Sequence, residues 1–362
     1  MRIKLRQTLR LLARLADRAG DPLLWGAKVA LTIAGRRGQR VHRILEGRRP
    51  APPGPWRVCL YSHYDRDGLL APHVEHALAA VAALGFRIHF VTTGPVLSQS
   101  LIDRVAPYCE TIIHKDNYGL DFGAWRLAWQ RVRRHGVPDE LLLLNDSVYG
   151  PLSDLGAVFA RMAGEPCDFW GITDSWDQKY HLQSYFVVLR KHVLESSAFE
   201  RFWRSFWLIN HKSYIVRRCE IGLTQRLLKA GFVPRALCPY TDVRTHAVRR
   251  LLSESQAAER AEAVFNLPGG QTFFSEAMPP PVRALLATKG NLVEATMNPM
   301  HHFWRDLITE FGCPFLKVDL VARNPVAIAN AYQWKQLVVE KTDYDPALIE
   351  HHLYRAVSRR VP

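Results

Sequence analysis

Cysteine is scarce and widely spaced in this sequence. The chain has 362 residues and six cysteines, and no two of them form a CxxC pair. That spacing argues against a structural zinc site, and a chain of this length can bury a large core without disulfide bonds. We therefore predict reduced thiols in a cytosolic protein.

The sequence also lacks a long apolar run. The segment PLLWGAKVALTIAG, residues 22–35, is too short and too interrupted by Lys28 to span a bilayer of about 30 Å. No cleavable signal is expected, because basic residues run through the early apolar residues instead of preceding them. A GxSxG nucleophile elbow is absent too, which argues against a Ser-His-Asp hydrolase.

Acidic residues are rare near the N-terminus. Residues 1–50 contain 13 Lys and Arg against three Asp and Glu, so most of the formal net charge of +14 lies there. On a helical wheel of residues 1–18, arginines occupy one half and leucines the other. Such a helix suits an anionic membrane surface, with guanidinium groups at the phosphates. Two alternatives stay open: a basic helix that packs on its own domain, and one that contacts RNA.

A linker, GRRPAPPGP at residues 47–55, separates this segment from the main domain. After it, short β-rich runs alternate with helical stretches. We predict strands at 57–63, 87–93, 111–114 and 140–145, and helices at 71–84, 97–106 and 121–135. The alternation is typical of an α/β fold with a mostly parallel sheet covered by helices on both faces.

The alternation continues toward the C-terminus. We predict further strands at 168–175 and 182–194, and helices at 196–209 and 220–230. The pattern weakens between residues 239 and 294 and becomes helical again in 298–362. No internal repeat is present.

Polar residues follow the most apolar strand. In ELLLLNDSVYGPL, residues 140–152, four leucines predict a central strand that ends at Asn145, Asp146 and Ser147. Ligands of open α/β sheets bind beyond the carboxyl ends of the strands. Asp146 could therefore bind a divalent cation that neutralises a diphosphate. The alternative is a plain turn, because Asn, Asp, Ser, Gly and Pro all favour turns.

Two helix starts are also candidates for chemistry. In HKDNYGLDFGAWRLAW, residues 114–129, Asp121 could cap a helix whose N-terminus, next to Gly119 and Gly123, suits a phosphate. In CEIGLTQRLLKAGF, residues 219–232, Glu220 could act as a general base. The alternatives are an ordinary cap and an acidic residue that merely favours the helix dipole.

The order of these segments resembles the GT-A nucleotide-sugar glycosyltransferases. The counterparts of the motifs in that fold are Asn117-Tyr118-Gly119, Asn145-Asp146-Ser147 and Cys219-Glu220. More closely, residues 57–240 resemble the rhamnan synthesis F family of bacterial surface-polysaccharide transferases. The segments that carry this resemblance are NYGLDFGAW, LLLLNDSVYGPL, DFWGITDS, HLQSYFVVLRK and EIGLTQRLLKAGF, with NPMHHFWRDLITEFGCPFLKVDLVARNP in the C-terminal portion.

The resemblance implies transfer of a sugar, L-rhamnose from a dTDP donor, onto a lipid-linked glycan such as O antigen or rhamnan. The protein would be peripheral on the inner face of the cell membrane, and the reaction inverting. Glu220 would be the base and Asp146 would hold the departing diphosphate, with Mg or Mn or without a metal. The sequence departs from the family pattern at two positions. Ser147 stands in the strand-end motif and Cys219 in the helix-start motif, and at each the wider family has a second carboxylate. A non-catalytic glycan-assembly scaffold is the alternative.

The resemblance also implies a set of binding residues. The predicted donor-binding residues are Ser62, Tyr64, Asp65, Asp67, Asn117, Gly119, Asp121, Asn145 and Ser147. The predicted acceptor-binding residues are Asp174, Gln183, Ser184 and Tyr185. The domains are then a membrane-associating segment and linker at 1–55, a GT-A domain at 56–240, and a mainly helical portion on the acceptor side at 241–362.

Overall fold

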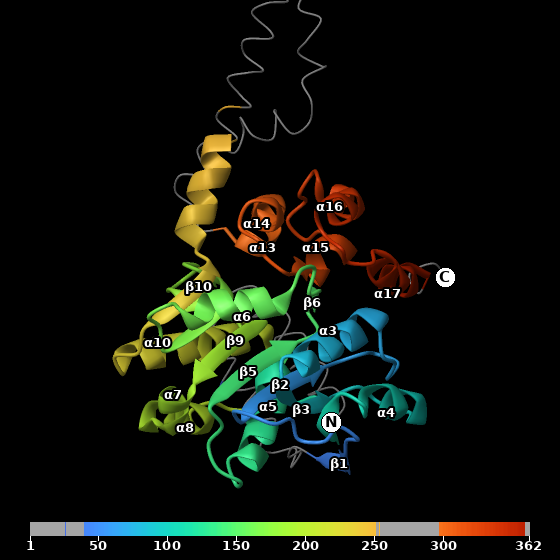
Figure 1. The fold of residues 1–362 in the computed structure, drawn as a ribbon, viewed down its shortest axis with the longest axis vertical. Coiled ribbons are helices and arrows are strands. Elements are labelled where there is room, and N and C mark those ends of the chain that lie inside the picture. The colour runs from blue at the N-terminus through green and yellow to red at the C-terminus, as the bar shows by residue number, and fades with distance from the viewer. Residues whose placement is uncertain (1–25, 27–39, 251–252, 254–296, 359–362) are drawn as a thin grey trace, which may run out of the picture.

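The computed structural model describes residues 26, 40–250, 253 and 297–358. A central sheet with helices on both faces forms the body, and the C-terminal helices lie over one end of it (Figure 1). The amphipathic helix predicted at residues 1–18 lies outside the described residues, as does the region 254–296. Within the described ranges, no helix has the length and apolar character needed to cross a membrane.

The sheet has the strand order β1-β4-β3-β2-β5-β9-β7-β10. Neighbours from β4 to β5 are parallel, as are β7 and β10, whereas β1 and β9 run antiparallel to their neighbours. The predicted α/β fold with a mostly parallel sheet is therefore confirmed. The strands are β1 Val41–Glu46, β2 Arg57–His63, β3 Phe86–Thr92, β4 Cys109–Lys115, β5 Glu140–Asn145, β7 Phe169–Ser175, β9 Phe186–Arg190 and β10 Pro234–Cys238, and β8 His181–Leu182 pairs with β7.

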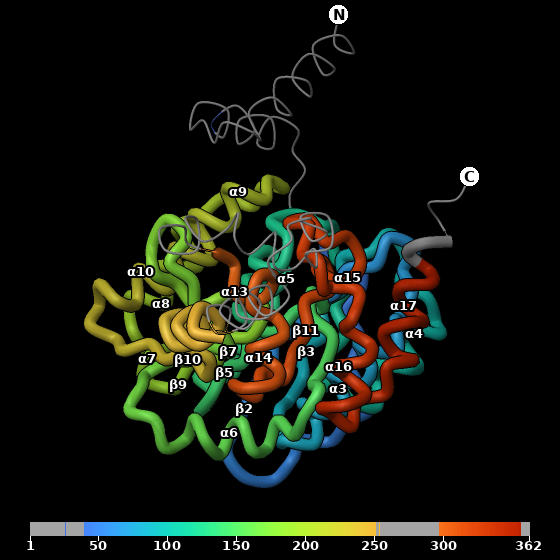
Figure 2. The backbone as a smooth tube through the Cα atoms, turned by 90° about the horizontal axis from the view of Figure 1, so that it is seen from above, coloured from blue at the N-terminus to red at the C-terminus, as the bar shows by residue number. Residues whose placement is uncertain are grey.

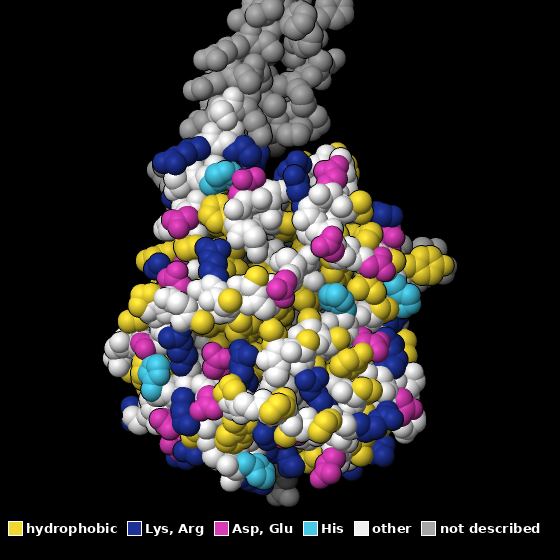
Figure 3. Space-filling view, in the orientation of Figure 1, with side chains coloured by type: hydrophobic (Ala, Val, Ile, Leu, Met, Phe, Trp, Pro, Cys, Tyr) yellow, Lys and Arg dark blue, Asp and Glu magenta, His cyan; other side chains and the backbone are white. Residues whose placement is uncertain are grey.

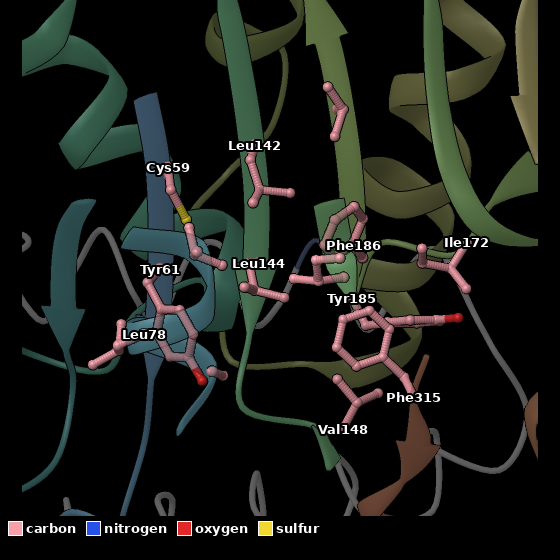
Figure 4. Packing of buried hydrophobic residues seen from close by; sticks show 14 of the residues in the cluster. Cys59, Tyr61, Leu78, Leu142, Leu144, Val148, Ile172, Tyr185, Phe186 and Phe315 are labelled. Carbon is pink, nitrogen blue, oxygen red and sulfur yellow. The ribbon is translucent and has the colours of Figure 1, made fainter. Parts of the chain in front are cut away.

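Alternate residues of each strand enter the two cores on either side of the sheet. Tyr61 of β2, Leu144 of β5 and Phe186 of β9 enter one core together (Figure 4), and α3, α4 and α6 cover that face. Leu60 and Leu143 enter the other core, under α5, α8 and α10. These helices are α3 Pro72–Ala83, α4 Gln99–Val105, α5 Leu120–Val132, α6 Leu155–Ala163, α8 Ser197–Arg204 and α10 Ile221–Lys229. The leucine run 141–144 thus belongs to a strand buried on both faces, as predicted.

The C-terminal portion joins the body through a short ladder. Strand β6, Val148–Tyr149, follows β5 and pairs antiparallel with β11, Leu316–Lys317. A third core around Tyr149 and Leu316 holds the C-terminal helices against this ladder. Those helices are α13 Pro299–His302, α14 Trp304–Thr309, α15 Val318–Ala322, α16 Trp334–Lys341 and α17 Ala347–Ser358.

Gly150, just after β6, is a position where only glycine fits. Its φ is +136°, and an added Cβ would lie 2.5 Å from the carbonyl oxygen of Pro314. The chain therefore leaves the strand-end turn in close contact with the segment that leads into β11.

Several elements differ from the sequence prediction; β6, β10 and β11 were not among the predicted strands. The stretch 182–194 is not one strand: residues 183–185 lie between β8 and β9, and α7, Lys191–Glu195, begins directly after β9. The Gln183 amide hydrogen-bonds to the Thr173 carbonyl, and the Ser184 amide to a side chain, so a regular ladder is interrupted there. Strand β1, not predicted, lies in the N-terminal segment; it is mostly exposed, so it carries no alternating apolar pattern.

Candidate functional site

A pocket of about 460 Å³ opens at the carboxyl ends of β2 and β5. These strands are parallel neighbours with Ser62 opposite Asn145, so the polar residues that follow each strand meet at one edge. The pocket is lined by the predicted site residues Tyr64, Asp65, Asp121, Asn145, Asp146, Ser147, Gln183, Ser184, Tyr185 and Glu220. It is also lined by residues that the sequence did not single out, among them Lys317, Asp319, Arg323 and His352.

Asp121 organises the floor of the pocket. Its two carboxylate oxygens accept hydrogen bonds from the Ser62 hydroxyl at 2.8 Å and from the Asn145 amide nitrogen at 3.0 Å. The predicted helix cap is wrong: Gly119 is the N-cap residue of α5, and Asp121 lies in the first turn. Burial raises the pKa of Asp121, and the hydrogen bond from Ser62 opposes that shift. With both oxygens engaged, Asp121 is suited to positioning Ser62 and Asn145.

Asp146 is fixed by the backbone of the loop after β2. Its Oδ2 accepts a hydrogen bond of 2.7 Å from the Tyr64 amide, and its own amide donates to the Ser62 carbonyl at 3.3 Å. Burial raises the pKa of Asp146 to about 8, and the nearby Asp121 carboxylate adds to the shift. At neutral pH the free protein therefore keeps much of Asp146 protonated. Positive charge brought into the pocket would favour the ionised form.

Lys317 supplies positive charge within the same pocket. Its ammonium donates a hydrogen bond of 3.0 Å to the Ser147 hydroxyl and lies 5.1 Å from the centre of the Tyr185 ring. Burial lowers the pKa of Lys317, while the carboxylates of Glu220 and Asp121 oppose that shift. Its signal in the sequence is weak, because it is a single lysine within the mostly apolar run CPFLKVDL.

Glu220 reaches the pocket from the opposite wall. It is the last residue of the π-helical turn Val216–Glu220, which precedes α10. Its Oε1 accepts a hydrogen bond of 2.9 Å from the Ser184 amide, and it forms no ion pair within the described residues. Cys219, which precedes it, is buried in the core under α10. One carboxylate oxygen of Glu220 is thus held by the backbone while the side chain lines the pocket.

Asp65 lines the pocket but is already engaged. It accepts hydrogen bonds from the amides of Asp67 and Leu69 and forms an ion pair of 3.1 Å with Arg355 of α17. Burial would raise the pKa of Asp65, but the amide hydrogen bonds and Arg355 outweigh it, so the pKa is lowered. Asp65 therefore stays ionised and anchors α17 over the loop after β2.

Five predicted residues do not line the pocket. Ser62 lies beneath it and acts through Asp121, and Asp67 contributes its amide to Asp65. Asn117 and Gly119 contact Asn210 instead: Asn210 donates to the Asn117 carbonyl, and the Gly119 amide donates to Asn210 at 2.9 Å.

Asp174 is the fifth. It ends β7, where its Oδ1 accepts a hydrogen bond of 2.5 Å from the Tyr240 amide. It holds the chain segment after β10 in place and does not line the pocket, although its ladder partner Leu182 directly precedes Gln183 of the predicted acceptor wall.

The pocket offers few ligands for a metal ion. No group of three or more His, Cys, Asp or Glu side chains suited to a metal occurs among the residues that the structure describes. Asp121 and Asp65 already accept two hydrogen bonds each. Mg²⁺ often binds through one or two carboxylates together with substrate phosphates. Asp146 therefore fits a divalent cation only when a phosphate-bearing ligand completes the coordination.

Residues 88–248 match the family described as Rhamnan synthesis protein F. Over these residues the chain is similar to the rhamnan synthesis F family. This confirms the predicted resemblance, and the matched region contains Asp121, Asp146 and Glu220. Lys317 lies beyond that region and joins the site through the β6-β11 ladder.

Two curated relatives share part of the chain. The protein y4gN of Sinorhizobium fredii is 28% identical over 218 residues, which are 59% of this chain and 56% of y4gN. The virulence protein VirA of Vibrio anguillarum is 24% identical over 242 residues, which are 66% of this chain and 70% of VirA. The chain thus spans about half the length of y4gN.

Two solved structures show a slight likeness to this chain. The glycosyltransferase GlyE of Streptococcus pneumoniae TIGR4 has 11% identity and a TM-score of 0.32, over 59% of this chain and 52% of GlyE. The mannosyltransferase PcManGT of Pyrobaculum calidifontis, solved with GDP-Man and Mn²⁺, has 13% identity and a TM-score of 0.31, over 98% of both chains. These values are too low to transfer an activity or a ligand.

Proposed function

We propose that this chain is a GT-A-type glycosyltransferase that moves a sugar from a nucleotide diphosphate to an acceptor hydroxyl, with inversion. One observation carries the proposal. Asp146 and Glu220 line the same pocket of about 460 Å³, and the Glu220 carboxylate forms no ion pair within the described residues. A non-catalytic scaffold would be expected to use Glu220 in a structural ion pair. The match of residues 88–248 to the rhamnan synthesis F family supports the same function.

The donor diphosphate would lie between Asp146 and Lys317. Negative charge accumulates on the diphosphate as its bond to the sugar breaks, so fixed positive charge there lowers the barrier. Lys317, held by the Ser147 hydroxyl at 3.0 Å, provides such a charge. A divalent cation held by Asp146 and the diphosphate would add Lewis-acid stabilisation. The loop after β2, with Tyr64 exposed at the pocket, would receive the nucleotide base.

Glu220 would remove the proton of the acceptor. The acceptor oxygen forms a bond to the anomeric carbon, the bond from that carbon to the diphosphate breaks, and the acceptor proton passes to Glu220. The Ser184 amide, 2.9 Å from Oε1, fixes the carboxylate for this transfer. Attack on the side opposite the leaving group inverts the configuration. Gln183, Ser184 and Tyr185 form the adjacent acceptor wall.

We also propose the identity of the sugar and of the acceptor. The family description, rhamnan synthesis, supports L-rhamnose from dTDP-L-rhamnose as the sugar and a lipid-linked cell-surface glycan as the acceptor. The 13 basic residues within 1–50 support attachment to the anionic inner face of the cell membrane. Residues 56–240 would form the transferase domain and 241–362 the acceptor side.

Ligand-induced stabilisation tests the proposal. The full chain is heated with dTDP, UDP or GDP, each with and without Mg²⁺ or Mn²⁺, because a ligand that binds only the native state raises the apparent melting temperature. We expect one nucleotide to stabilise the protein, and the same nucleotide to inhibit transfer from its sugar derivative. A protein that responds to none of them and transfers no sugar would support the scaffold alternative.

A further inference from the structure

A second pocket, of about 730 Å³, lies between α8, α10 and the π-helical turn Val216–Glu220. Helices α8 and α10 pack side by side there (Figure 2). The turn contributes to both pockets: Val216 and Glu220 line the candidate site, whereas Arg217 and Arg218 line the second pocket. The second pocket is therefore separate from the candidate site but shares a wall with it.

The lining of the second pocket is strongly cationic. Six basic side chains line it and no Asp or Glu does; they are Lys179, Arg201, Arg217, Arg218, Arg226 and Lys229. On the face in Figure 3, by contrast, Lys and Arg are interspersed with Asp and Glu. Like charges gathered around one cavity repel each other, and a bound anion relieves that repulsion.

Two arginines of α8 differ in their surroundings, although they lie only one turn apart. Arg204 lies three residues after Arg201 on α8 but does not line the pocket, and it forms an ion pair of 2.7 Å with Glu200. Arg201, Arg218 and Arg226 have no carboxylate partner among the described residues. Guanidinium groups present a planar fork of donors that matches phosphate oxygens. Three of the arginines that line the cavity are thus without a carboxylate partner among the described residues.

The backbone leaves room for a ligand between these side chains. Gly222 lines the pocket one turn after Arg218, and an added Cβ there would contact only the Arg217 carbonyl, at 3.6 Å. Phe202 and Ile221, both buried, form an apolar part of the lining. The cavity therefore combines a fixed floor with long basic side chains at its walls.

We propose that this second pocket binds the phosphate or diphosphate group of an anionic ligand. The site is distinct from the proposed donor site and does not depend on the transferase activity. Two sources share this chemistry: a soluble phosphate compound and the headgroup of a phosphate-bearing lipid.

Titration of the full chain with inorganic pyrophosphate tests the site. We expect the double variant Arg218→Gln/Arg226→Gln to bind pyrophosphate about tenfold or more weakly than the wild type, because two charge-assisted contacts are lost. The matched control Arg133→Gln/Arg134→Gln removes the same charge from the exposed end of α5, outside the pocket, and should bind normally. Equal affinities for the wild type and the Arg218/Arg226 variant, or equal losses in both double variants, would overturn the proposal.

Two further variants keep the test decisive. Lys317→Met removes the cation of the candidate site, so pyrophosphate binding that survives this change but not the Arg218/Arg226 change belongs to the second pocket. If the double variant does not fold, judged by its melting curve, the single variant Arg201→Gln on the exposed face of α8 takes its place. Failure of the proposed transferase activity would leave this binding unchanged, so the two proposals fail separately.

Vesicle flotation distinguishes the two sources. Full-chain wild type and the Arg218→Gln/Arg226→Gln variant are floated with vesicles of phosphatidylcholine alone or mixed with phosphatidylglycerol. If the variant loses both the binding of pyrophosphate and the flotation with anionic vesicles, the ligand is a lipid headgroup. If it loses only pyrophosphate and floats as the wild type does, residues 1–38 account for the flotation and the ligand is a soluble phosphate compound. A variant that keeps both refutes the phosphate site.

Discussion

The Lys317 ammonium donates a hydrogen bond of 3.0 Å to the Ser147 hydroxyl, although the two residues are 170 positions apart in the sequence. The β6-β11 ladder produces this contact, because it pairs Lys317 with Val148 directly after the strand-end turn. A cation therefore lies against Ser147, the position where the resemblance to the GT-A transferases predicts a second carboxylate. The proposed donor site pairs one carboxyl group with one ammonium group.

Replacing Lys317 tests this arrangement. We expect Lys317→Met to weaken binding of the cognate nucleoside diphosphate about tenfold or more, because a charge-assisted contact to phosphate is lost. Thermal stability should stay equal or rise, since a partly buried charge is removed. Nucleotide titration and a melting curve measure the two effects. Lys341→Met, at an exposed position ending α16, is the control and should bind normally.

Glu220→Gln should abolish transfer and leave donor binding intact. A lost general base costs about 10²- to 10⁴-fold in turnover, while the amide side chain can still accept the hydrogen bond from Ser184. Turnover and nucleotide affinity are measured on the same preparation, with the exposed Glu195→Gln as control. Turnover within a few-fold of the wild type would exclude Glu220 as the base.

Asp146→Ala should weaken donor binding, and most strongly in the presence of Mg²⁺. The wild-type carboxyl group has a pKa raised to about 8, so an ion held with the diphosphate must displace its proton. Binding of the nucleotide with Mg²⁺ should therefore strengthen as the pH rises toward 8 in the wild type and stay flat in the variant. An unchanged affinity in Asp146→Ala would remove this residue from the donor site.

Stability at acid pH should depend on His63. This histidine is buried at the end of β2, with Nδ1 3.0 Å from the Thr92 hydroxyl, and burial lowers its pKa from 6.5 to about 4. The unfolded chain gains a proton near pH 6.5 and the native state does not, so stability falls as the pH drops from 6.5 toward 4. The loss can reach about 3 kcal/mol.

Urea unfolding at pH 7 and pH 5 measures this effect. His63→Gln should lose less stability between these two values than the wild type, whereas the exposed His135→Gln should follow the wild type. Parallel losses in all three proteins would contradict the assignment to His63.

The proposed membrane segment must be removed at the right place. Strand β1 begins at Val41 and pairs with β4, so a deletion through residue 46 removes part of the sheet. We expect deletion of residues 1–38 to abolish flotation with anionic vesicles and to leave the melting temperature close to that of the full chain. Deletion of residues 1–46 should lower the melting temperature. A 1–38 deletion that still floats would contradict membrane attachment through this segment.

The sequence predicted what local patterns encode. The leucine run predicted a central strand, because a short segment that is apolar on both faces is typical of a strand covered by helices on both sides. The same run placed Asp146 at the carboxyl edge of the sheet. The sequence could not show that Asp174, near the end of another buried strand, is engaged outside the pocket. What distinguishes Asp174 from Asp146 is the Tyr240 amide, which engages Asp174 from 66 positions away.

Lys317 and β1 escaped prediction for different reasons. Lys317 lies in a strand of two residues, which is too short to show a period. β1 is an edge strand with four exposed residues among its six, so burial imposes no alternation on its sequence. Both depend on partners that are distant in the chain, and a local pattern carries no information about them.

The π-helical turn Val216–Glu220 positions side chains in both pockets, so the two linings depend on the backbone conformation of one turn. Side chains of this turn line different cavities, with Arg218 in one and Glu220 in the other. Such a turn holds one residue more than an α-helical turn. Losing that residue would rotate the guanidinium groups and the carboxylate together. The two pockets therefore cannot be remodelled independently by insertions or deletions here; one can change alone only by substitution of its own side chains.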